Sequence, residues 1–435
     1  MKFYNREKEL DILYKTGKDS LTSAKMTVIV GRRRVGKTAL IKQAFKNELY
    51  FFVSKKNEAL LCEELQTLAQ EVLNIKILGE FKEFAKLFEQ LLIISQNLPF
   101  TLTIDEFQEF LAINPSIYST IQNIWDSYKQ SAKINLILCG SIYSLMQKIF
   151  EDKKEPLFGR ANRKINLKPF NTQTLKTIFF DNSKNCNNSD LLAFYVLTGG
   201  VAKYVESFVD ENVFTLDAML DTILDEHSLF LEEGKNLLIE EFGKEYGTYF
   251  SVLSLLASSK TSRSEIESIL EKNVGGYLDR LENEYSIIKK IKPIFAKEAS
   301  RSVKYEIVDN FLAFWFRFIY KNKSAIEIQN FEYVRNIAKR DFSVFSGKFL
   351  ERYFKDKLSL GGNYSQIGTY WDKTSNNEID IVALNENEKF AHFYEVKLNK
   401  ERIDLKLLQH KAQKLINSEL SGYNIEYFGL SVFDM

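Results

Sequence analysis

The feature that most constrains the fold of this chain is a glycine-rich turn at residues 31–38, which fits the pattern G-x-x-x-x-G-K-[ST]. A β-branched run at 26–30 precedes it and a helical pattern begins at about Thr38, so we expect a strand, a loop and a helix. In such a loop the backbone N–H groups surround phosphates, the lysine reaches the terminal phosphates and the hydroxyl group binds Mg²⁺. We therefore predict a nucleotide site made of Gly31, Arg32, Arg33, Arg34, Val35, Gly36, Lys37, Thr38 and Ala39.

Two acidic residues, Asp105 and Glu106, directly follow a second predicted strand at 101–104. Because the carboxyl ends of parallel strands meet at one edge of a sheet, these carboxylates are expected beside the glycine-rich loop. Asp105 is then placed to hold Mg²⁺ through water, and Glu106 to polarise the water that attacks the terminal phosphate. The pair predicts that the bound nucleotide is hydrolysed.

Two further side chains have two interpretations each. Ser141 follows a third predicted strand at 134–139, where it either contacts the γ-phosphate as a sensor or caps the next helix. Arg160 lies in a predicted loop at 156–160. It either stabilises transition-state charge, in its own subunit or in a neighbouring one, or forms a surface salt bridge. The sequence leaves both choices open.

The pattern of strands and helices predicts an α/β fold with several parts. Alternating strands and helices over 26–150 predict a parallel sheet with helices on both faces. A helical stretch follows, then three short helices and a polar strand pair, typical of a winged helix-turn-helix, and finally a helix, three strands, a helix and a strand. The predicted domains are a P-loop core at 1–168, a helical lid at 169–240, a winged helix at 241–310, a helical connector at 311–345 and a nuclease-like α/β domain at 346–435.

Several motifs resemble one known family. Besides the glycine-rich loop, they are the segments at 3–10, 104–108, 156–160, 198–204 and 305–315. Together they are similar to the archaeal-type ATPases, a branch of the AAA+ and STAND NTPases, over essentially the whole chain. The resemblance implies that the nucleotide is ATP, that Asn5 and Arg6 lie near the adenine, and that Lys203 of the lid approaches the nucleotide. Ala202 stands where this family usually has proline.

The strand pair of the predicted winged helix is strongly basic. Over residues 289–304 it carries one acidic residue, Glu298, among six basic ones, whereas the third helix is mostly acidic. Such a ribbon either contacts nucleic-acid phosphates without sequence preference or is an ordinary solvated surface. Sequence-specific recognition by the acidic helix is not expected. The basic residues are Lys289, Lys290, Lys292, Lys297, Arg301 and Lys304.

Near the C-terminus, Asp380, Glu395 and Lys397 form the pattern D-x14-E-x-K on two predicted strands. Residues i and i+2 of a strand share a face, so Glu395 and Lys397 point the same way. Paired carboxylates bind a divalent cation, here Mg²⁺ or Mn²⁺, and the lysine orients a metal-bound water. Glu351 is a candidate outer-sphere acid. The arrangement resembles the PD-(D/E)XK nuclease fold, and the alternative is a structural salt-bridge cluster.

Composition sets wide limits on function. With 59 Lys+Arg, 58 Asp+Glu and 45% hydrophobic residues, the chain is not a disordered one. Its three cysteines, Cys62, Cys139 and Cys186, form no C-x-x-C pair, which is typical of a reducing compartment. No apolar run reaches membrane-spanning length and no signal peptide is recognisable, so we expect a cytoplasmic protein without a membrane partner.

Two hypotheses of function follow. The first is an ATP-binding and ATP-hydrolysing protein that acts on DNA, by backbone contacts, through a metal-dependent nuclease-like domain. The second is a nucleotide-dependent switch or scaffold whose C-terminal domains bind partners without cleavage. The intact D-x14-E-x-K pattern favours the first, and the acidic third helix of the winged domain favours the second. A homo-oligomer is compatible with both.

Overall fold

A computed structural model describes residues 1–184, 187–242, 246–298, 300, 302–372 and 377–435 of the chain. Cys186 and Arg301, which the sequence analysis named, lie outside these residues. The chain divides into two compact units, Phe3–Pro169 and Phe170–Met435, and Met1–Lys2 belongs to the second. Among the described residues, no helix combines the length and the apolar character that a bilayer span requires.

The first unit is built on a five-stranded sheet with the order β2-β3-β4-β1-β5. Every described pair of neighbouring strands is parallel, as the alternation of strands and helices predicts. All seven residues of β4 are buried, which explains its continuous apolar sequence. The strands are β1 (Lys25–Val30), β2 (Leu49–Phe52), β3 (Phe100–Asp105), β4 (Ile134–Gly140) and β5 (Arg163–Asn166).

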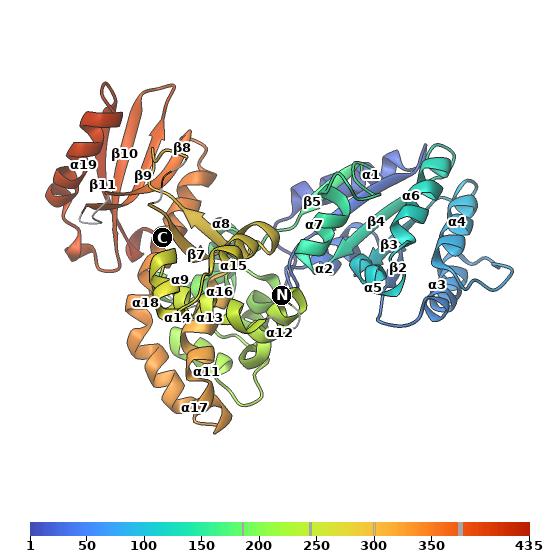
Figure 1. The fold of residues 1–435 in the computed structure, drawn as a ribbon, viewed down its shortest axis with the longest axis horizontal. Helices are drawn as coiled ribbons and strands as arrows, with labels where there is room; N and C mark the ends of the chain where they lie inside the picture. Colours follow the sequence, from blue (N-terminus) through green and yellow to red (C-terminus); the bar gives the residue numbers. More distant parts are fainter. Residues whose placement is uncertain (185–186, 243–245, 299, 301, 373–376) are drawn as a thin grey trace. The chain divides into compact units, whose positions relative to one another are not determined.

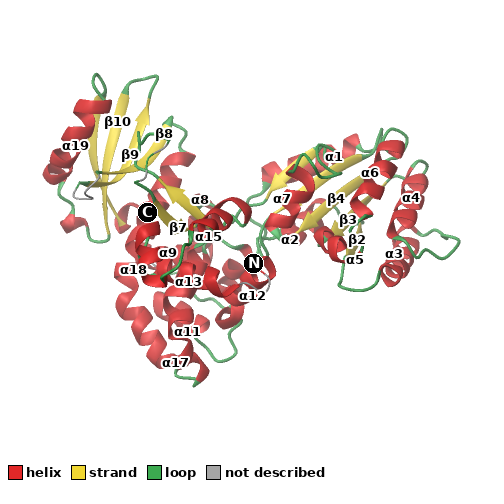
Figure 2. Cartoon of the chain, in the orientation of Figure 1, coloured by secondary structure: helices red, strands yellow, loops and turns green. Residues whose placement is uncertain are grey.

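Helices cover both faces of this sheet (Figure 2). Side chains of β1 alternate between two cores: Val28 and Val30 pack on one face and Ile29 on the other. The core that contains Ile29 includes residues of α1 and α2, and the opposite core includes residues of α3, α4, α6 and α7. The helices are α1 (Glu7–Asp19), α2 (Lys37–Ala44), α3 (Glu58–Leu73), α4 (Phe84–Ser95), α5 (Phe110–Ile113), α6 (Ile117–Tyr128) and α7 (Tyr143–Glu151).

The turn between β1 and α2 depends on glycine at two places. Gly36 has φ +97°, which an L side chain rarely adopts. At Gly31 a Cβ atom would lie 2.7 Å from the backbone oxygen of Leu167 and 3.0 Å from Val35. Since β1, β3 and β4 are parallel neighbours, this turn, Asp105 and Gly140 lie at the same edge of the sheet.

The second unit begins with helices and continues into a two-stranded antiparallel hairpin (Figure 1). The first helices are α8 (Thr172–Asn182), α9 (Asn188–Thr198), α10 (Ala202–Asp210), α11 (Leu216–Ile223) and α12 (Phe230–Phe242). Next come α13 (Tyr246–Ala257), α14 (Arg263–Leu270), α15 (Gly275–Asp279) with a π-helical turn at Arg280–Glu284, and the hairpin of β6 (Ile288–Ile291) and β7 (Lys304–Ile307). After the hairpin lie α16 (Asn310–Phe314), α17 (Lys323–Glu327) and α18 (Phe331–Leu360).

The last part of the unit is a four-stranded mixed sheet with the order β11-β10-β9-β8. Strands β10 and β11 are parallel and the other two pairs are antiparallel. Helix α19 packs against the sheet, where Leu408, Ala412 and Leu415 are buried. Helix α18 is continuous across the domain boundary predicted at 345/346. The elements are β8 (Gln366–Trp371), β9 (Glu378–Asn385), β10 (Phe390–Lys397), α19 (Leu405–Glu419) and β11 (Asn424–Ser431).

The basic hairpin packs against this sheet, which neither interpretation of the sequence anticipated. The backbone N–H of Ile294, just after β6, donates to the oxygen of Thr369 in β8 at 2.8 Å, and Ile294 is buried in the core of the sheet. The indole N–H of Trp371 donates to Ser302 at 2.8 Å. Lys304 forms an ion pair with Glu378 at 2.8 Å. The hairpin is therefore fixed to the sheet and is not a free ribbon in solvent.

Glu306 connects the hairpin to α18 and makes the stability of this junction pH-dependent. Burial opposes its charge, but Arg352 at 3.3 Å and Lys289 at 2.6 Å outweigh burial and lower the pKa of Glu306 to about 2. A lowered pKa stabilises the folded state above the unfolded pKa, and the stabilisation is lost as the pH falls toward the folded pKa.

We expect Glu306→Gln to reduce the free energy of unfolding at pH 7 by about 2 kcal/mol, less than the full pKa shift because the side chain is partly exposed. The difference from the wild type should shrink between about pH 4.5 and pH 2. Urea titrations followed by tryptophan fluorescence at several pH values measure it. A difference that stays constant with pH would show that the ion pairs are not its source.

Candidate active site

Lys37 is held at the start of α2 with its ammonium group turned back onto the loop. Its Nζ donates to the backbone oxygens of Gly31 at 2.7 Å and Arg32 at 3.3 Å. Burial lowers the pKa of Lys37, and Glu106 and Asp105 oppose the shift, whereas the charge of Arg33 adds to it. A desolvated ammonium group gains from a nearby anion, so the site is prepared for a phosphate.

Asp105 is the centre of a small polar cluster beside Lys37. The hydroxyl of Tyr50 donates to its Oδ2, the thiol of Cys139 to its Oδ1 at 3.1 Å, and the N–H of Glu106 to Oδ1 at 2.9 Å. The Tyr50 hydroxyl also lies 3.3 Å from the Thr38 hydroxyl. Tyr50 thus connects Thr38 and Asp105, the two residues that the sequence predicts as Mg²⁺ ligands. Both offer oxygen atoms at the same edge of the sheet, and oxygen is the ligand atom that Mg²⁺ prefers.

Glu106 is fixed by Ser141 and Gln108. Its Oε2 accepts from the backbone N–H of Ser141 at 3.1 Å, the Ser141 hydroxyl at 2.8 Å and the amide of Gln108 at 2.5 Å. No described residue bonds Oε1. Glu106 also has φ +55°, an unfavourable backbone conformation for a residue with a Cβ atom. Three donors therefore orient a carboxylate that keeps one oxygen for a further partner.

The helix-cap interpretation of Ser141 is wrong. Helix α7 begins at Tyr143 and its N-cap residue is Ile142, which makes no side-chain cap bond. Both polar groups of Ser141 face Glu106 because the chain leaves β4 through Gly140, beside the end of β3. Ser141 is thus a positioning residue for Glu106, and a contact with the γ-phosphate stays a prediction.

We expect Ser141→Ala to lower kcat for ATP hydrolysis about 10-fold with little change in KM, because it removes one hydrogen bond that orients a charged group. Ser141→Thr, which keeps the hydroxyl, should restore most of the rate. Steady-state kinetics of both variants measure the split between kcat and KM. An unchanged kcat for Ser141→Ala would contradict the positioning role.

The remaining loop residues differ in exposure. Val35 is buried in the core with Leu40 and Ile41, so only its backbone is available to a phosphate. Ala39, on the first turn of α2, and Arg33 are exposed, and Arg32 and Arg34 are half-buried.

Asn5 and Arg6 lie in the same unit, at the start of α1. Arg6 is 8% exposed and has φ +85°. Its guanidinium donates to the oxygen of Lys168 at 2.6 Å and to Glu9 at 3.4 Å, and the Asn5 side chain accepts from the Arg6 N–H at 2.7 Å. Lys168 directly follows Leu167, whose oxygen lies against Gly31. Arg6 therefore contacts the residue next to Leu167, which itself lies against the base of the loop. Contact of Asn5 and Arg6 with adenine stays a prediction.

The two other predicted contributors have partners elsewhere. Arg160 forms an ion pair with Asp126 at 3.1 Å and donates to the backbone oxygen of Phe158 at 2.9 Å. The ion pair is the salt bridge that one of the two interpretations of Arg160 expects. Lys203 belongs to the second unit, where it forms an ion pair with Glu206 at 2.9 Å. A role of Arg160 or Lys203 in nucleotide hydrolysis stays a prediction.

The carboxylate pattern of the second unit does converge in space. The register of β9 and β10, continued by one residue, places Glu395 opposite Asp380. Lys397 Nζ lies 3.2 Å from Asp380 Oδ2 and 3.4 Å from Glu395 Oε1. Backbone N–H groups of Val396 and Asp404 hold the two carboxylates at 2.7 Å each. Burial lowers the pKa of Lys397, but the carboxylates outweigh it and raise the pKa overall.

Glu351 on α18 lies near this cluster. Burial, followed by the charge of Asp380, raises its pKa to about 8, against the effect of Lys355 at 4.0 Å. The donor set of Asp380 and Glu395 is one that Mg²⁺ and Mn²⁺ accept, and Lys397 forms ion pairs with both carboxylates. Among the described residues, no group of three or more metal-ligating side chains is assembled here or elsewhere.

Sequence reasoning missed Tyr50, Cys139 and Gln108. Tyr50 reaches Asp105 because β2 pairs with β3, where Tyr50 lies opposite Thr103. Burial and the Asp105 bond raise the pKa of Tyr50, so its hydroxyl stays a donor. A polar residue on the strand next to β3 was the only sequence signal, and it required knowledge of the strand order.

Comparison with known proteins agrees with this geometry. Residues 3–208 match the family described as an ATPase domain predominantly from Archaea, and residues 315–415 match one described as archaea bacterial proteins of unknown function. The protein MJECL04 of Methanocaldococcus jannaschii is 29% identical over 420 residues, which are 91% of this chain and 87% of that protein.

A solved structure has a similar fold. The Walker-type ATPase PABY2304 of Pyrococcus abyssi has a TM-score of 0.54 and 19% identity over 72% of this chain and 96% of that one. A slighter likeness, with a TM-score of 0.47 and 14% identity over 75% of this chain and 96% of that one, links the chain to the ORC2 protein of Aeropyrum pernix.

The parallel sheet, the glycine-rich loop and the two acidic residues at the end of β3 define a P-loop ATPase. Within that class, the chain carries an archaeal-type ATPase domain at residues 3–208, and residues 315–415 match the second family.

Proposed function

We propose that this chain binds ATP with Mg²⁺ at the carboxyl edge of the parallel sheet and hydrolyses it to ADP and phosphate. Loop N–H groups and Lys37 bind the phosphates, and Thr38 and Asp105 hold the ion, which neutralises phosphate charge. Glu106 Oε1 accepts a proton from the water that attacks the γ-phosphorus, and the β–γ bridging oxygen leaves with ADP.

The observation that carries this proposal is the state of Glu106. Three hydrogen bonds hold Oε2, while no described residue binds Oε1. A general base must be oriented and must keep an acceptor for water, and Glu106 meets both conditions.

We further propose that the second unit cleaves a nucleic-acid backbone. Asp380 and Glu395 would hold a divalent cation, which supplies charge neutralisation and an acidic water, and Lys397 would orient that water. Support comes from the convergence of the three side chains on adjacent strands and from the backbone N–H groups that fix both carboxylates. The expected substrate is DNA, which this unit would contact through the DNA backbone.

The buried free thiols of Cys62 and Cys139 support a location in a reducing cytoplasm.

A second candidate function is a nucleotide-dependent switch that binds partners without cleaving them. One observation favours it: Lys397 already forms ion pairs with both carboxylates of the cluster. In that case Asp380 and Glu395 are structural, and nucleotide binding alone changes the affinity for a partner.

The test incubates the wild-type chain with end-labelled linear DNA and with circular DNA, with Mg²⁺, Mn²⁺ or EDTA, each with and without ATP. The nuclease proposal expects new strand ends only where a divalent ion is present. Phosphate release from ATP is measured in the same tubes and is expected to stop with EDTA. ATP hydrolysis without any DNA product under all conditions would leave the switch as the function.

A further inference from the structure

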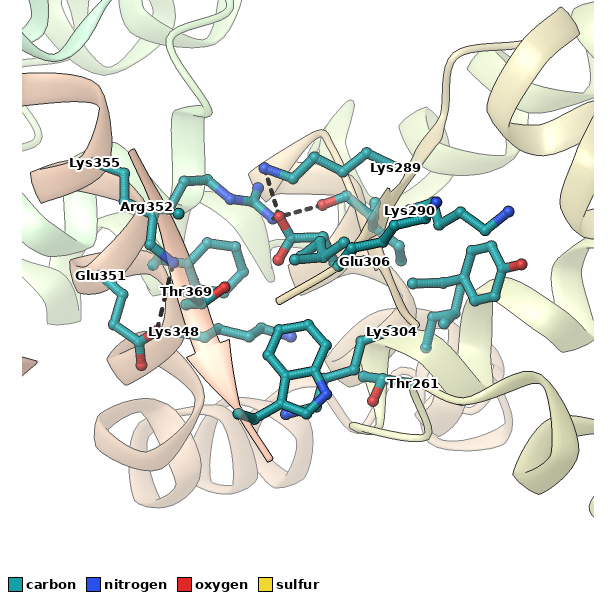
Figure 3. Close-up of a pocket in the computed structure, with 18 of the residues that line it drawn as sticks. Thr261, Lys289, Lys290, Lys304, Glu306, Lys348, Glu351, Arg352, Lys355 and Thr369 are labelled. Carbon is teal, nitrogen blue, oxygen red and sulfur yellow. Dashed lines mark hydrogen bonds and ion pairs between the residues drawn. The ribbon is translucent and has the colours of Figure 1, made fainter. Parts of the chain in front are cut away.

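The second unit contains a cavity of about 510 Å³ between the hairpin β6–β7, helix α18 and strand β8 (Figure 3). All its lining residues belong to the unit Phe170–Met435. A cavity of this size is typical of sites for small ligands and has room for one or two nucleotides, whereas a duplex is too wide. The basic hairpin therefore faces this cavity.

The charge of the lining is strongly positive. Seven basic side chains face four carboxylates across the cavity. The carboxylates are Glu306, Glu351, Asp356 and Glu378, and the basic residues are Lys289, Lys290, Lys292, Lys304, Lys348, Arg352 and Lys355.

Ion pairs inside the cavity account for only part of this positive charge. Lys289 and Arg352 converge on the single carboxylate of Glu306 (Figure 3), and Lys304 pairs with Glu378. The Nε of Arg352 is buried and has no hydrogen-bond partner among the described residues.

Lys348 has no carboxylate partner within the described part of the chain. Its Nζ lies 5.1 Å from the ring centres of Phe345 and Phe349, which are its recorded contacts. Burial, with help from Arg352, lowers its pKa to about 8 against the effect of Glu306. Lys290 likewise faces a ring, that of Tyr305, at 5.9 Å. Lys348 is partly buried and lacks the counter-charge that buried cations normally have, whereas Lys290 is exposed.

The cavity also lies beside the carboxylate cluster. Glu351 and Glu378 both line the cavity. Glu351 is one turn of α18 from Lys348, and Glu378 is two residues before Asp380 on β9. Phosphate-binding cations and the cluster are therefore neighbours in one unit.

We propose that this cavity binds the phosphate-bearing end of a single nucleic-acid strand. A terminal phosphate carries up to two negative charges near pH 7, whereas a phosphate inside a strand carries one, so the excess of positive charge favours an end. The inference rests on the proposed action on nucleic acid, but binding requires neither the divalent ion nor cleavage.

The test measures binding of a fluorescent tetranucleotide by anisotropy in EDTA at low salt, with a phosphate at the 5′ end, at the 3′ end or at neither. For the wild-type chain, one phosphate-ended strand should bind about 10-fold more tightly than the hydroxyl-ended strand, as expected for one or two charge-assisted bonds. Equal binding of all three strands would overturn the proposal. Unlabelled AMP that competes as well as the phosphate-ended strand would assign the cavity to a free nucleotide and overturn it too.

Variants locate the effect. Lys348→Met keeps the apolar stem and should reduce the preference for the phosphate end to twofold or less, and Lys290→Met should reduce it in part. Lys339→Met, on the same helix but paired with Asp217 away from the cavity, is the matched control and should keep the preference. A full preference in both Lys348→Met and Lys290→Met would place the phosphate elsewhere. Asp380→Asn should bind like the wild type, so loss of cleavage alone leaves this inference standing.

Discussion

Replacing Glu106 with glutamine is expected to lower the rate of ATP hydrolysis about 1000-fold while ATP binding is retained. Glutamine keeps the size of the side chain and its oxygen can still accept from Ser141, so the local structure should persist. It cannot take a proton from the attacking water. Single-turnover hydrolysis and equilibrium binding of a fluorescent ATP analogue separate the two effects.

Glu63→Gln is a suitable control for this variant, because Glu63 is an exposed residue of α3 in the same unit. It should hydrolyse ATP at the wild-type rate. If Glu106→Gln turned over ATP as fast as the control, Glu106 would not be the base, and the hydrogen bonds around it would serve the fold alone.

Replacing Lys37 with alanine should impair both ATP binding and turnover, with a combined loss of about 1000-fold in kcat/KM. The lysine is the cation that burial holds ready for phosphate, and its removal takes away an interaction that strengthens as charge develops in the transition state. Binding should weaken here, in contrast to Glu106→Gln.

Lys46→Ala removes an exposed lysine shortly after α2 and controls for a simple change of charge. It should bind and hydrolyse ATP normally. Circular dichroism checks that Lys37→Ala is folded, since its Nζ also bonds the oxygens of Gly31 and Arg32. Unchanged kcat/KM in a folded Lys37→Ala would contradict a phosphate site at this loop.

The sequence was sufficient to predict the parallel sheet and the position of its loop because those signals are local. The run 26–30, the glycines of the turn and the acidic pair after 101–104 each act within a few residues. The C-terminal order of a helix, three strands, a helix and a strand was also correct for the same reason. The carboxylates at 380 and 395 were predicted as neighbours because strands that follow one another in the chain tend to pair.

Features that depend on distant pairing were not predictable. Tyr50 reaches Asp105 only through the register of β2 on β3, and Ser141 contacts Glu106 only because β4 lies beside β3. From the sequence, the hairpin was predicted to be a ribbon that contacts either nucleic acid or solvent. Its packing on β8 depends on Ile294, which fits against Gly368, where a Cβ atom would lie 3.2 Å from the Cβ of Ile294. That close approach joins residues 74 positions apart, beyond any local pattern.

We propose that one chain joins an ATP-hydrolysing unit to a unit that cuts nucleic acid. The most direct measurement compares cleavage of end-labelled DNA in Mn²⁺ by the wild type, Asp380→Asn and Asp217→Asn. Asp217 is an exposed partner of Lys339, so its variant loses an ion pair away from the cluster. We expect Asp380→Asn to lose cleavage about 100-fold or more and Asp217→Asn to retain it. Equal cleavage by all three proteins would contradict the claim.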